Sequence, residues 1–221
     1  MCIRDRNNTV LNICQENKIE LDIEQYGTTL TREDLKKLLG LDHDRQAILN
    51  SLAKDKLLNP LISHYRGLTI MHQDPYECLI SFMTSTVSNI PRIMLNLRNL
   101  RINSNSLING TLEYSFPTAK HITRLGESKL RKLGFGYRSK YIALTCNEII
   151  NRAIDFDLWK KKTDAELTSA LMDFPGVGRK IAECVALFGF NRRTSFPVDV
   201  WVKRALYKLK PKLNNMTSEE L

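Results

Sequence analysis

Hydrophobic and polar positions alternate along the first part of this chain. Apolar residues of the segment 8–26, among them Val10, Ile13 and Ile23, are separated by polar ones. A period of two is typical of strands, and residues 16–18 have the polar composition of a turn. The pattern therefore predicts a small β-hairpin near the N-terminus.

From Thr31 onward the apolar positions recur at helical spacing. Thr31 with Asp34 three residues later predicts a helix N-cap, and Asp74 followed by Pro75 predicts another. Residues 103–115 are polar and predict a loop. Helices are expected at 44–57, 76–86, 91–101, 117–122, 127–133, 139–152, 164–172, 179–190 and 199–209. We therefore predict a mainly α fold, in which a small β-containing part precedes a helical domain.

The two ends of the chain do not fit this pattern. Residues 1–6, MCIRDR, match no predicted element, and we treat them as a candidate non-native scar. Residues 217–221 have the pattern of an N-cap and first helical turn that then stops. We therefore divide the chain into residues 1–6, a remnant of an α+β domain at 7–40 and a helical region at 41–221, and expect a fragment truncated at its C-terminus.

The composition is that of a globular protein with an excess of basic residues. The 221 residues are 43% hydrophobic and 26% charged, with a formal net charge of +9. No apolar run reaches the roughly 18 residues of a membrane span, and no signal-peptide pattern opens the chain, so we expect a cytoplasmic protein. The five cysteines show neither C-x-x-C nor zinc-site spacing, which predicts no disulfide and no bound metal.

The positive charge is concentrated in residues 120–141 and 192–212, whereas residues 1–60 are about neutral. A basic excess of this kind favours a polyanionic partner such as nucleic acid. Taken alone, the two segments are better explained as solvated helix faces. The segment that lies between them changes this balance.

That segment is DFPGVGRKIAECVALFGF, residues 173–190, and it reads as a helix, a tight turn and a second helix. Gly176 and Gly178 permit a positive φ and leave backbone amides open at the start of the second helix. Such amides form a site for a phosphate, independent of base sequence. We therefore expect Gly176, Val177, Gly178 and Arg179 to contact a DNA backbone.

Lys180 follows in the first turn, where its positive charge opposes the helix dipole. A lysine there is a candidate nucleophile, and the alternative is a lysine that binds only solvent or phosphate. Cys184 lies one turn later and is either a thiolate beside this ammonium or a plain buried thiol. Asp199 either caps the next helix or offers a carboxylate near Lys180 for charge stabilisation or proton transfer.

These residues also carry a family resemblance. LMDFPGVGRKIAECVALFGF followed by FPVDVWVKRAL closely resembles the helix-hairpin-helix (HhH-GPD) DNA glycosylases, and most of all the prokaryotic 8-oxoguanine DNA glycosylases. GFGYRSKYI at 134–142 and HQDPYECLISFMTSTVSNIPRI at 72–93 resemble two further segments of that family. The resemblance covers roughly residues 30–210. It implies a monomeric, nucleoid-associated cytoplasmic enzyme of base excision repair that binds damaged double-stranded DNA.

The resemblance also implies residue roles. Lys180 would attack C1′ of the damaged nucleoside and form a Schiff base, and Asp199 would be the catalytic carboxylate of a bifunctional glycosylase and AP (apurinic/apyrimidinic) lyase. Tyr137 would wedge into the base stack, with Arg138 at the opposite strand. Further DNA contacts are expected at Asn89, Arg92 and Lys203, and base-pocket positions at Cys184 and Trp201. No cofactor is implied, although a monovalent cation at the hairpin stays open.

One departure from the family bears on specificity. Val87 stands where the family carries Asn or Gln, and a valine cannot hydrogen-bond to an orphaned cytosine. Two other functions are compatible with the fold: a monofunctional alkylpurine glycosylase in which water attacks, and a non-catalytic helix-hairpin-helix DNA-binding fragment. Lys180 argues against the first of these, and its pairing with Asp199 argues against the second.

Overall fold

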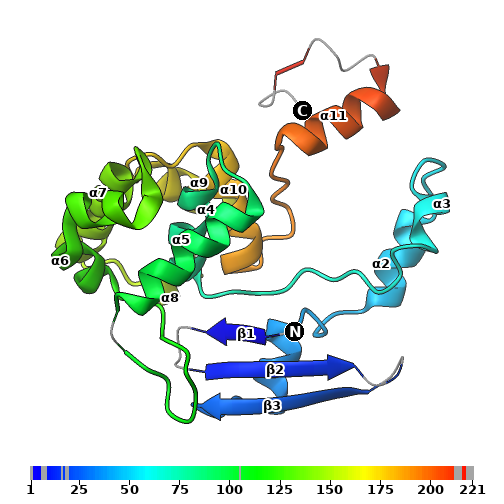
Figure 1. Ribbon diagram of the computed structural model, residues 1–221. Helices are drawn as coiled ribbons and strands as arrows, with labels where there is room; N and C mark the ends of the chain where they lie inside the picture. The colour runs from blue at the N-terminus through cyan, green and yellow to red at the C-terminus, as the bar shows by residue number, and fades with distance from the viewer. Residues whose placement is uncertain are drawn as a thin grey trace.

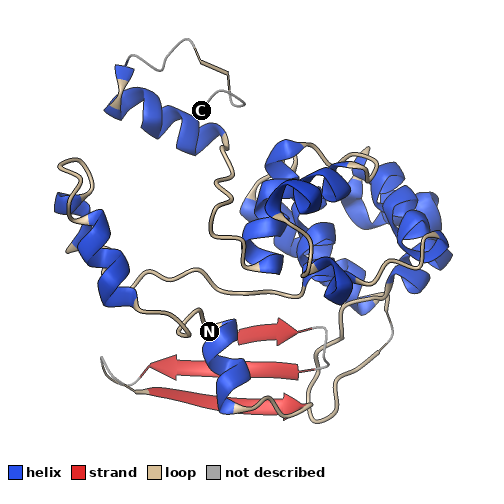
Figure 2. Ribbon diagram, turned by 180° about the vertical axis from the view of Figure 1, so that it is seen from behind, coloured by secondary structure: helices blue, strands red, loops and turns tan. Residues whose placement is uncertain are grey.

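The computed structural model describes residues 2–5, 9–15, 17, 20–104, 106–211 and 216–217 (Figure 1). A small antiparallel sheet lies beside a helical body, and two helical segments extend away from both of them (Figures 1 and 2). The predicted mainly α fold with a small β-containing N-terminal part is therefore confirmed.

The sheet has the strand order β1 (Cys2–Asp5), β2 (Thr9–Gln15) and β3 (Leu21–Gly27), all antiparallel. The predicted hairpin corresponds to β2 and β3, with Ile13 paired to Ile23. Two residues of its predicted turn, 16 and 18, lie outside the described part of the chain, as do residues 218–221 of the predicted terminal turn.

The first residues of the chain were assigned to no element, and this prediction is wrong. Strand β1 pairs with β2 in a continuous register from Cys2 opposite Asn12 to Asp5 opposite Thr9. The pattern within so short a segment does not show strand pairing, because the pairing energy comes from a partner that lies elsewhere in the sequence. The sheet therefore begins before residue 7, where we had placed its boundary.

Helix α1 (Arg32–Leu38) covers one face of the sheet. Thr31 and Asp34 form the predicted capping box, in which each side chain bonds the backbone of the other. Leu11 and Ile13 of β2 are buried with Leu39 in a small hydrophobic core of their own. The alternation of β2 and the helical spacing of α1 thus bury the same apolar cluster.

The helical body forms around a second and larger core. Its elements are α4 (Pro75–Ser85), α5 (Ile90–Ile102), α6 (Ala119–Leu130), the π-helical turn η1 (Arg131–Phe135), α7 (Arg138–Asn151), α8 (Phe156–Trp159), α9 (Asp164–Met172) and α10 (Arg179–Phe190). The core contains the fully buried Leu79, Phe135, Ile142 and Leu171, contributed by four of these elements. The predicted cap at Asp74 is confirmed, since its side chain accepts from the Glu77 amide at 2.9 Å.

Three predicted helices have different bounds in the structure. The helix expected at 44–57 is α2 (Arg45–Leu52), followed by turns and the short α3 (Asn59–Ile62). The two helices expected at 117–122 and 127–133 correspond to the two parts of α6, which meet at a kink where Gly126 has a non-helical φ of +71°. The predicted break between them is therefore confirmed, and glycine permits the positive φ that it requires.

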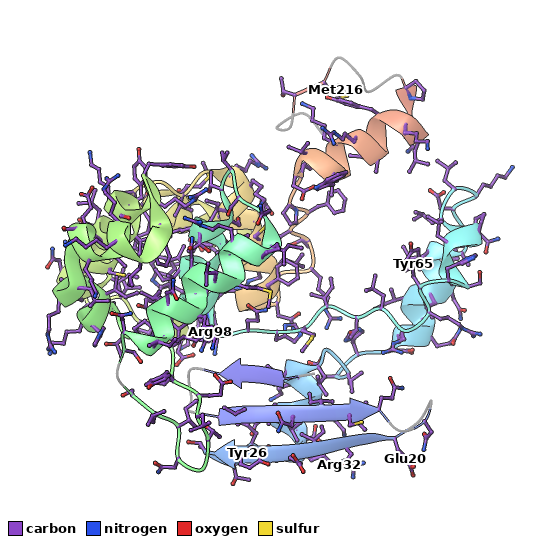
Figure 3. The ribbon with its side chains drawn as sticks, in the orientation of Figure 1. Glu20, Tyr26, Arg32, Tyr65, Arg98 and Met216 are labelled. Atoms are coloured by element: carbon purple, nitrogen blue, oxygen red, sulfur yellow. The ribbon has the colours of Figure 1, made fainter. Side chains whose placement is uncertain are left out.

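Two segments lie apart from the helical body. The α2–α3 segment, which ends near Tyr65, and α11 (Val200–Leu209) both extend away from the helical body. Figures 2 and 3 show this from opposite sides. Neither α2 nor α11 has a buried residue. In the described part of the chain, no helix has the length and apolar character needed to cross a membrane.

Candidate active site

The turn between α9 and α10 is packed tightly against α7. Gly176 has a φ of +79°, and a Cβ on it would lie 2.6 Å from Cγ and 2.8 Å from Cβ of Tyr141. Thr145, one turn further along α7, donates its hydroxyl to the Pro175 carbonyl at 3.2 Å. Only glycine fits at position 176, so the predicted turn chemistry is confirmed at that residue.

The first turn of α10 leaves the amides at the start of the helix open. Gly178 is the N-cap residue and gives no side-chain cap, and Gly176 and Arg179 are exposed. The first amides of a helix have no partner within it, so they remain available to an anion. Val177 is 5% exposed and belongs to the core, and its amide donates to the Phe174 carbonyl at 3.1 Å, so the contact of this residue with DNA stays a prediction.

Lys180 is half-buried on α10, with an aromatic wall beside it. Its Nζ lies 5.6 Å from the centroid of the Phe82 ring, which in turn stacks on Phe188. Among the residues that the structure describes, Lys180 makes no ion pair. The amine therefore lies against the face of an aromatic ring, and no carboxylate of the described residues holds its nitrogen in an ion pair.

Cys184 lies one helical turn beyond Lys180 and is 4% exposed. Burial raises the pKa of this thiol to about 11, and the nearby Lys180 ammonium lowers it by less than burial raises it. The Asp199 carboxylate raises it further. Of the two interpretations of Cys184, the raised pKa favours the plain buried thiol, because the cost of burying a charge exceeds the attraction of the ammonium. Both Lys180 and Asp199 act on this one sulfur, so both charges lie near it.

Asp199 is the N-cap of α11. Its Oδ1 accepts from the amides of Trp201 at 2.9 Å and Val202 at 2.8 Å. Its Oδ2 makes no hydrogen bond to any residue the structure describes. The cap fixes the orientation of the carboxylate and leaves one oxygen for chemistry, so the capping and catalytic interpretations are compatible.

The loop between α4 and α5, residues 86–89, is held by the start of α7. Arg138 donates from Nε to the Thr86 carbonyl at 2.8 Å and from Nη2 to the Val87 carbonyl at 2.8 Å. Its guanidinium also lies 4.8 Å from the centroid of the Tyr137 ring. Arg138 thus binds this loop with Nε and Nη2, while Nη1 donates to the Phe135 carbonyl at 3.4 Å, which gives it a structural role beyond the predicted contact with DNA.

Val87 is at the tip of the 86–89 loop in an unfavourable conformation. It has a φ of +47° and is 89% exposed. A β-branched residue in the left-handed region is strained, and such strain is found mainly at functional sites. Tyr137, 48% exposed, lies next to it and reaches the same Thr86 carbonyl with its hydroxyl at 3.5 Å.

A depression of about 700 Å³ adjoins this loop. Its lining residues are Val87, Ser88, Asn89, Arg92, Gly134, Gly136 and Arg138. The structure thus brings together the predicted Asn89, Arg92 and Arg138. Asn89 caps α5 by accepting from the Arg92 amide at 3.0 Å, and Arg92 donates to the Gly134 carbonyl at 3.4 Å.

The predicted positions on α11 lie in more open surroundings. Trp201 is 72% exposed and packs against the Arg204 guanidinium at 5.1 Å from its ring centroid. Lys203 Nζ lies 5.5 Å from the centroid of the Tyr207 ring. The base-pocket role of Trp201 and the DNA contact of Lys203 therefore stay predictions.

The sequence analysis missed several supporting residues. Tyr141 and Thr145 hold the hairpin, and the α5 asparagines Asn96 and Asn99 donate to the Gly134 and Leu133 carbonyls at 3.3 and 3.5 Å. Because asparagine is a weak helix former, two asparagines within one predicted helix were the sequence signal that could have indicated such a supporting role. Among the described residues, no group of three or more His, Cys, Asp or Glu side chains is arranged to hold a metal ion.

Residues 85–221 match the family described as HhH-GPD superfamily base excision DNA repair protein, and the chain belongs to this superfamily. The chain is 36% identical over 185 residues to the N-glycosylase/DNA lyase OGG1 of Arabidopsis thaliana, an alignment that covers 75% of this chain and 50% of the relative. The chain therefore spans about half the length of that curated relative.

Two solved structures are similar over nearly the whole chain. MBOgg1 in complex with a low-affinity DNA ligand has a TM-score of 0.84 at 31% identity, covering 92% of this chain and 71% of that one. The Clostridium acetobutylicum 8-oxoguanine glycosylase/lyase, bound to double-stranded DNA with cytosine opposite 8-oxoguanine, has a TM-score of 0.76 at 27% identity, covering 95% and 75%. Because the relatives include a plant protein, the prokaryotic assignment stays a prediction.

Proposed function

We propose that this chain is a bifunctional DNA glycosylase and AP lyase that removes 8-oxoguanine from duplex DNA. The observation that carries the proposal is the Lys180 amine, which lies in the first turn after the glycine hairpin and pairs with no carboxylate of the described residues. The charges of Lys180 and of the Asp199 carboxylate both act on the neutral Cys184 thiol, so the three groups belong to one site. The similarity to glycosylase/lyases supports both the reaction and the lesion.

The chemistry uses this chain's own residues. The deprotonated Lys180 amine forms a bond to C1′ of the flipped nucleotide while the bond from C1′ to the base breaks, and the base leaves with that electron pair and takes up a proton. The Asp199 carboxylate offsets the positive charge that develops on the sugar. The amine nitrogen then loses a proton, and its electron pair expels the ring oxygen O4′ from C1′, which takes up a proton and leaves an open-chain imine. This imine acidifies C2′, loss of the C2′ proton expels the 3′ phosphate, and water then releases the sugar from Lys180.

DNA binding has two supports on the surface. The open amides around Gly178 donate to a phosphate, and the exposed Tyr137 enters the base stack next to the flipped nucleotide. The depression beside Val87 and Arg92 then receives the opposite strand. The partner is damaged double-stranded DNA, bound by one copy of the chain in the cytoplasm.

No cofactor takes part in the proposed reaction, because the nucleophile and the stabilising carboxylate both come from the protein. A monovalent cation at the hairpin 173–178 is a finer proposal. It predicts that potassium or sodium strengthens DNA binding beyond the effect of ionic strength, which a comparison of chloride salts at fixed ionic strength would measure.

The test is borohydride trapping on a duplex with 8-oxoguanine opposite cytosine, and on a matched duplex with a preformed AP site. Reduction of the imine links protein to DNA, and the product is resolved on a denaturing gel. We expect a covalent band from the wild-type chain on both duplexes and none from Lys180→Gln.

Arg179→Gln is the matched control, because it removes a neighbouring cation of the same helical turn. It weakens binding but retains trapping at saturating protein. A wild-type chain that binds DNA and traps neither duplex would contradict the proposal, and would favour a water-using glycosylase or a non-catalytic module. Trapping of the AP site alone would retain the lyase and reject 8-oxoguanine as the lesion.

A further inference from the structure

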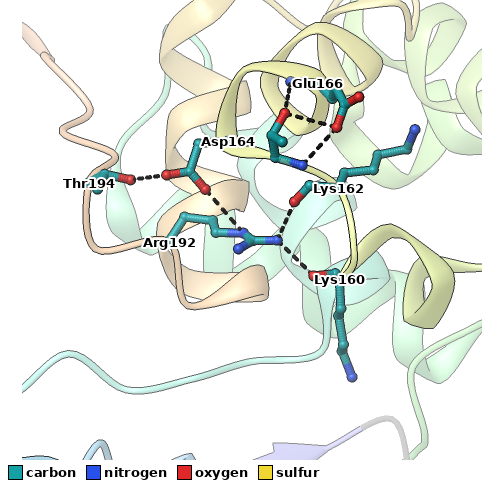
Figure 4. Close-up of polar contacts among 7 residues, drawn as sticks. Lys160, Lys162, Asp164, Glu166, Arg192 and Thr194 are labelled. Atoms are coloured by element: carbon teal, nitrogen blue, oxygen red, sulfur yellow. Dashed lines mark hydrogen bonds and ion pairs between the residues drawn. The ribbon is translucent and has the colours of Figure 1, made fainter.

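The loop that leads to Asp199 is fastened to the helical body by one arginine. Arg192 follows α10 directly, and its Nη2 donates to the carbonyls of Lys160 and Lys162, both at 2.8 Å (Figure 4). Its Nε lies 3.4 Å from Asp164 Oδ1. Three groups from the start of α9 and the segment before it therefore surround one guanidinium.

The same carboxylate holds the loop a second time. The Thr194 hydroxyl donates to Asp164 Oδ2 at 2.5 Å, so one carboxylate binds two residues of the loop (Figure 4). The backbone adds two bonds, from the Arg192 amide to Ala186 at 2.9 Å and from the Ser195 amide to Arg192 at 3.0 Å. We call Arg192, Asp164 and Thr194 the loop clamp.

Beyond Ser195, which is itself buried, the chain that carries Asp199 has no buried residue up to the end of α11, and residues 197–199 are half-buried. Phe196 is 62% exposed, and α11, which begins right after Asp199, has no buried residue. Three residues separate Ser195 from Asp199, and the four Cα–Cα steps between them reach roughly 14 Å when extended. The position of the Asp199 carboxylate therefore depends on where the loop clamp fixes the chain.

Lys180 has a different support. It lies on α10, whose Ile181, Ala182 and Val185 are buried in the main core. Loosening the loop clamp would therefore displace Asp199 and leave the amine where it is. A mutation of Arg192, which contacts neither Lys180 nor Asp199, should therefore affect the carboxylate without affecting the amine.

We propose that Arg192 is a positioning residue that holds Asp199 in register with Lys180, and that base excision depends on it more than imine formation does. The inference rests on the proposed function. Base loss creates positive charge on the sugar, so it needs a carboxylate placed to well within 1 Å. An AP site already has an aldehyde, and its reaction with the amine needs Lys180 alone.

The test compares Arg192→Ala with Arg193→Ala, a neighbouring arginine of the same loop and charge whose side chain contacts His43 at 3.1 Å instead of the clamp. Single-turnover excision of 8-oxoguanine and borohydride trapping on a preformed AP site are measured with each. For Arg192→Ala we expect excision to fall roughly 10- to 100-fold while AP-site trapping stays within about twofold. For Arg193→Ala both should stay within about twofold.

Two further variants protect the test against misfolding. Arg192→Lys keeps the charge but not the fork that binds several acceptors, so it should recover only part of the excision rate. Thr194→Val, at an exposed position, should lower excision about threefold and add little to Arg192→Ala, because both act through Asp164. An equal fall in excision and AP trapping would show a folding defect and overturn the inference, and so would unchanged excision. Failure of the wild type to trap an AP site would instead reject the proposed function.

Discussion

Two tight turns on the proposed DNA-binding face are held by the same helix in opposite ways. The hairpin 173–178 is held by close packing, with Gly176 against Tyr141 and with Val177 in the core. The 86–89 loop is held by hydrogen bonds from Arg138 to two carbonyls, and its tip, Val87, is exposed and strained. Both anchors belong to α7.

The difference separates two ways of presenting backbone to a ligand. A turn built on glycine costs little in backbone strain and leaves its amides bare, which suits a phosphate. A turn held from outside by an arginine can keep a β-branched residue in a conformation that it would not choose alone. A turn built on glycine is suited to binding a phosphate whatever the base sequence, and a turn held by an arginine is suited to inserting a side chain into a base stack.

The largest effect is expected from Gly176→Ala. The alanine would have to adopt a φ of +79° and would overlap Tyr141, so the free energy of unfolding should fall by at least about 1–3 kcal/mol, with loss of DNA binding. Urea unfolding and a binding titration measure both. Gly178→Ala is the control, since its Cβ has open space, and its cost should stay below about 1 kcal/mol. Equal costs for the two would contradict the packing argument.

A smaller effect is expected from Arg138→Ala, which releases the 86–89 loop but not the hairpin. The free energy of unfolding should fall by about 1 kcal/mol, while hydrogen exchange at the amides of residues 86–89 accelerates. Exchange at the hairpin amides serves as the internal control and should not change. Arg138→Lys should protect the loop only in part, because a lysine cannot bind both carbonyls with one planar fork. Acceleration at both turns would show that they are not held independently.

The smallest effect, and one of opposite sign, is expected from Val87→Asn. Asparagine tolerates the left-handed region, so relief of strain at a φ of +47° should raise the free energy of unfolding by up to about 1 kcal/mol. Thermal unfolding measures the change. Val87→Ala, which has no such tolerance, is the comparison and should gain less. A destabilised Val87→Asn would show that the loop carries no strain at this residue.

Much of the hairpin could be predicted because its causes are local. Glycine spacing, the caps at Thr31 and Asp74, and the place of Lys180 in a first turn all depend on neighbours within a few residues. The supports of the site could not be predicted in this way. Tyr141 meets Gly176 and Arg192 meets Asp164 only after the helices pack, and no local pattern records such contacts.

The choice between the two interpretations of Cys184 and the missed first strand have a related cause. The thiolate interpretation rested on a neighbour on the same helix, but burial by the rest of the body outweighs that neighbour and favours the plain thiol. The strand β1 was missed because its partner, β2, supplies the reason for it to be extended. In both cases the deciding contribution comes from residues far away in the sequence.

Because α7 carries both anchors, Arg138 and Tyr141, this one helix fixes the spacing between the two turns. Tyr137 and Tyr141 are four residues apart, a rise of about 6 Å along the axis, and no hinge lies between them. In the proposed function, this spacing sets the distance along α7 between the Tyr137 ring that enters the base stack and the hairpin that binds a phosphate. We expect a duplex that contacts both to bend to this spacing, and a lesion that softens the base step to lower the cost of that bending.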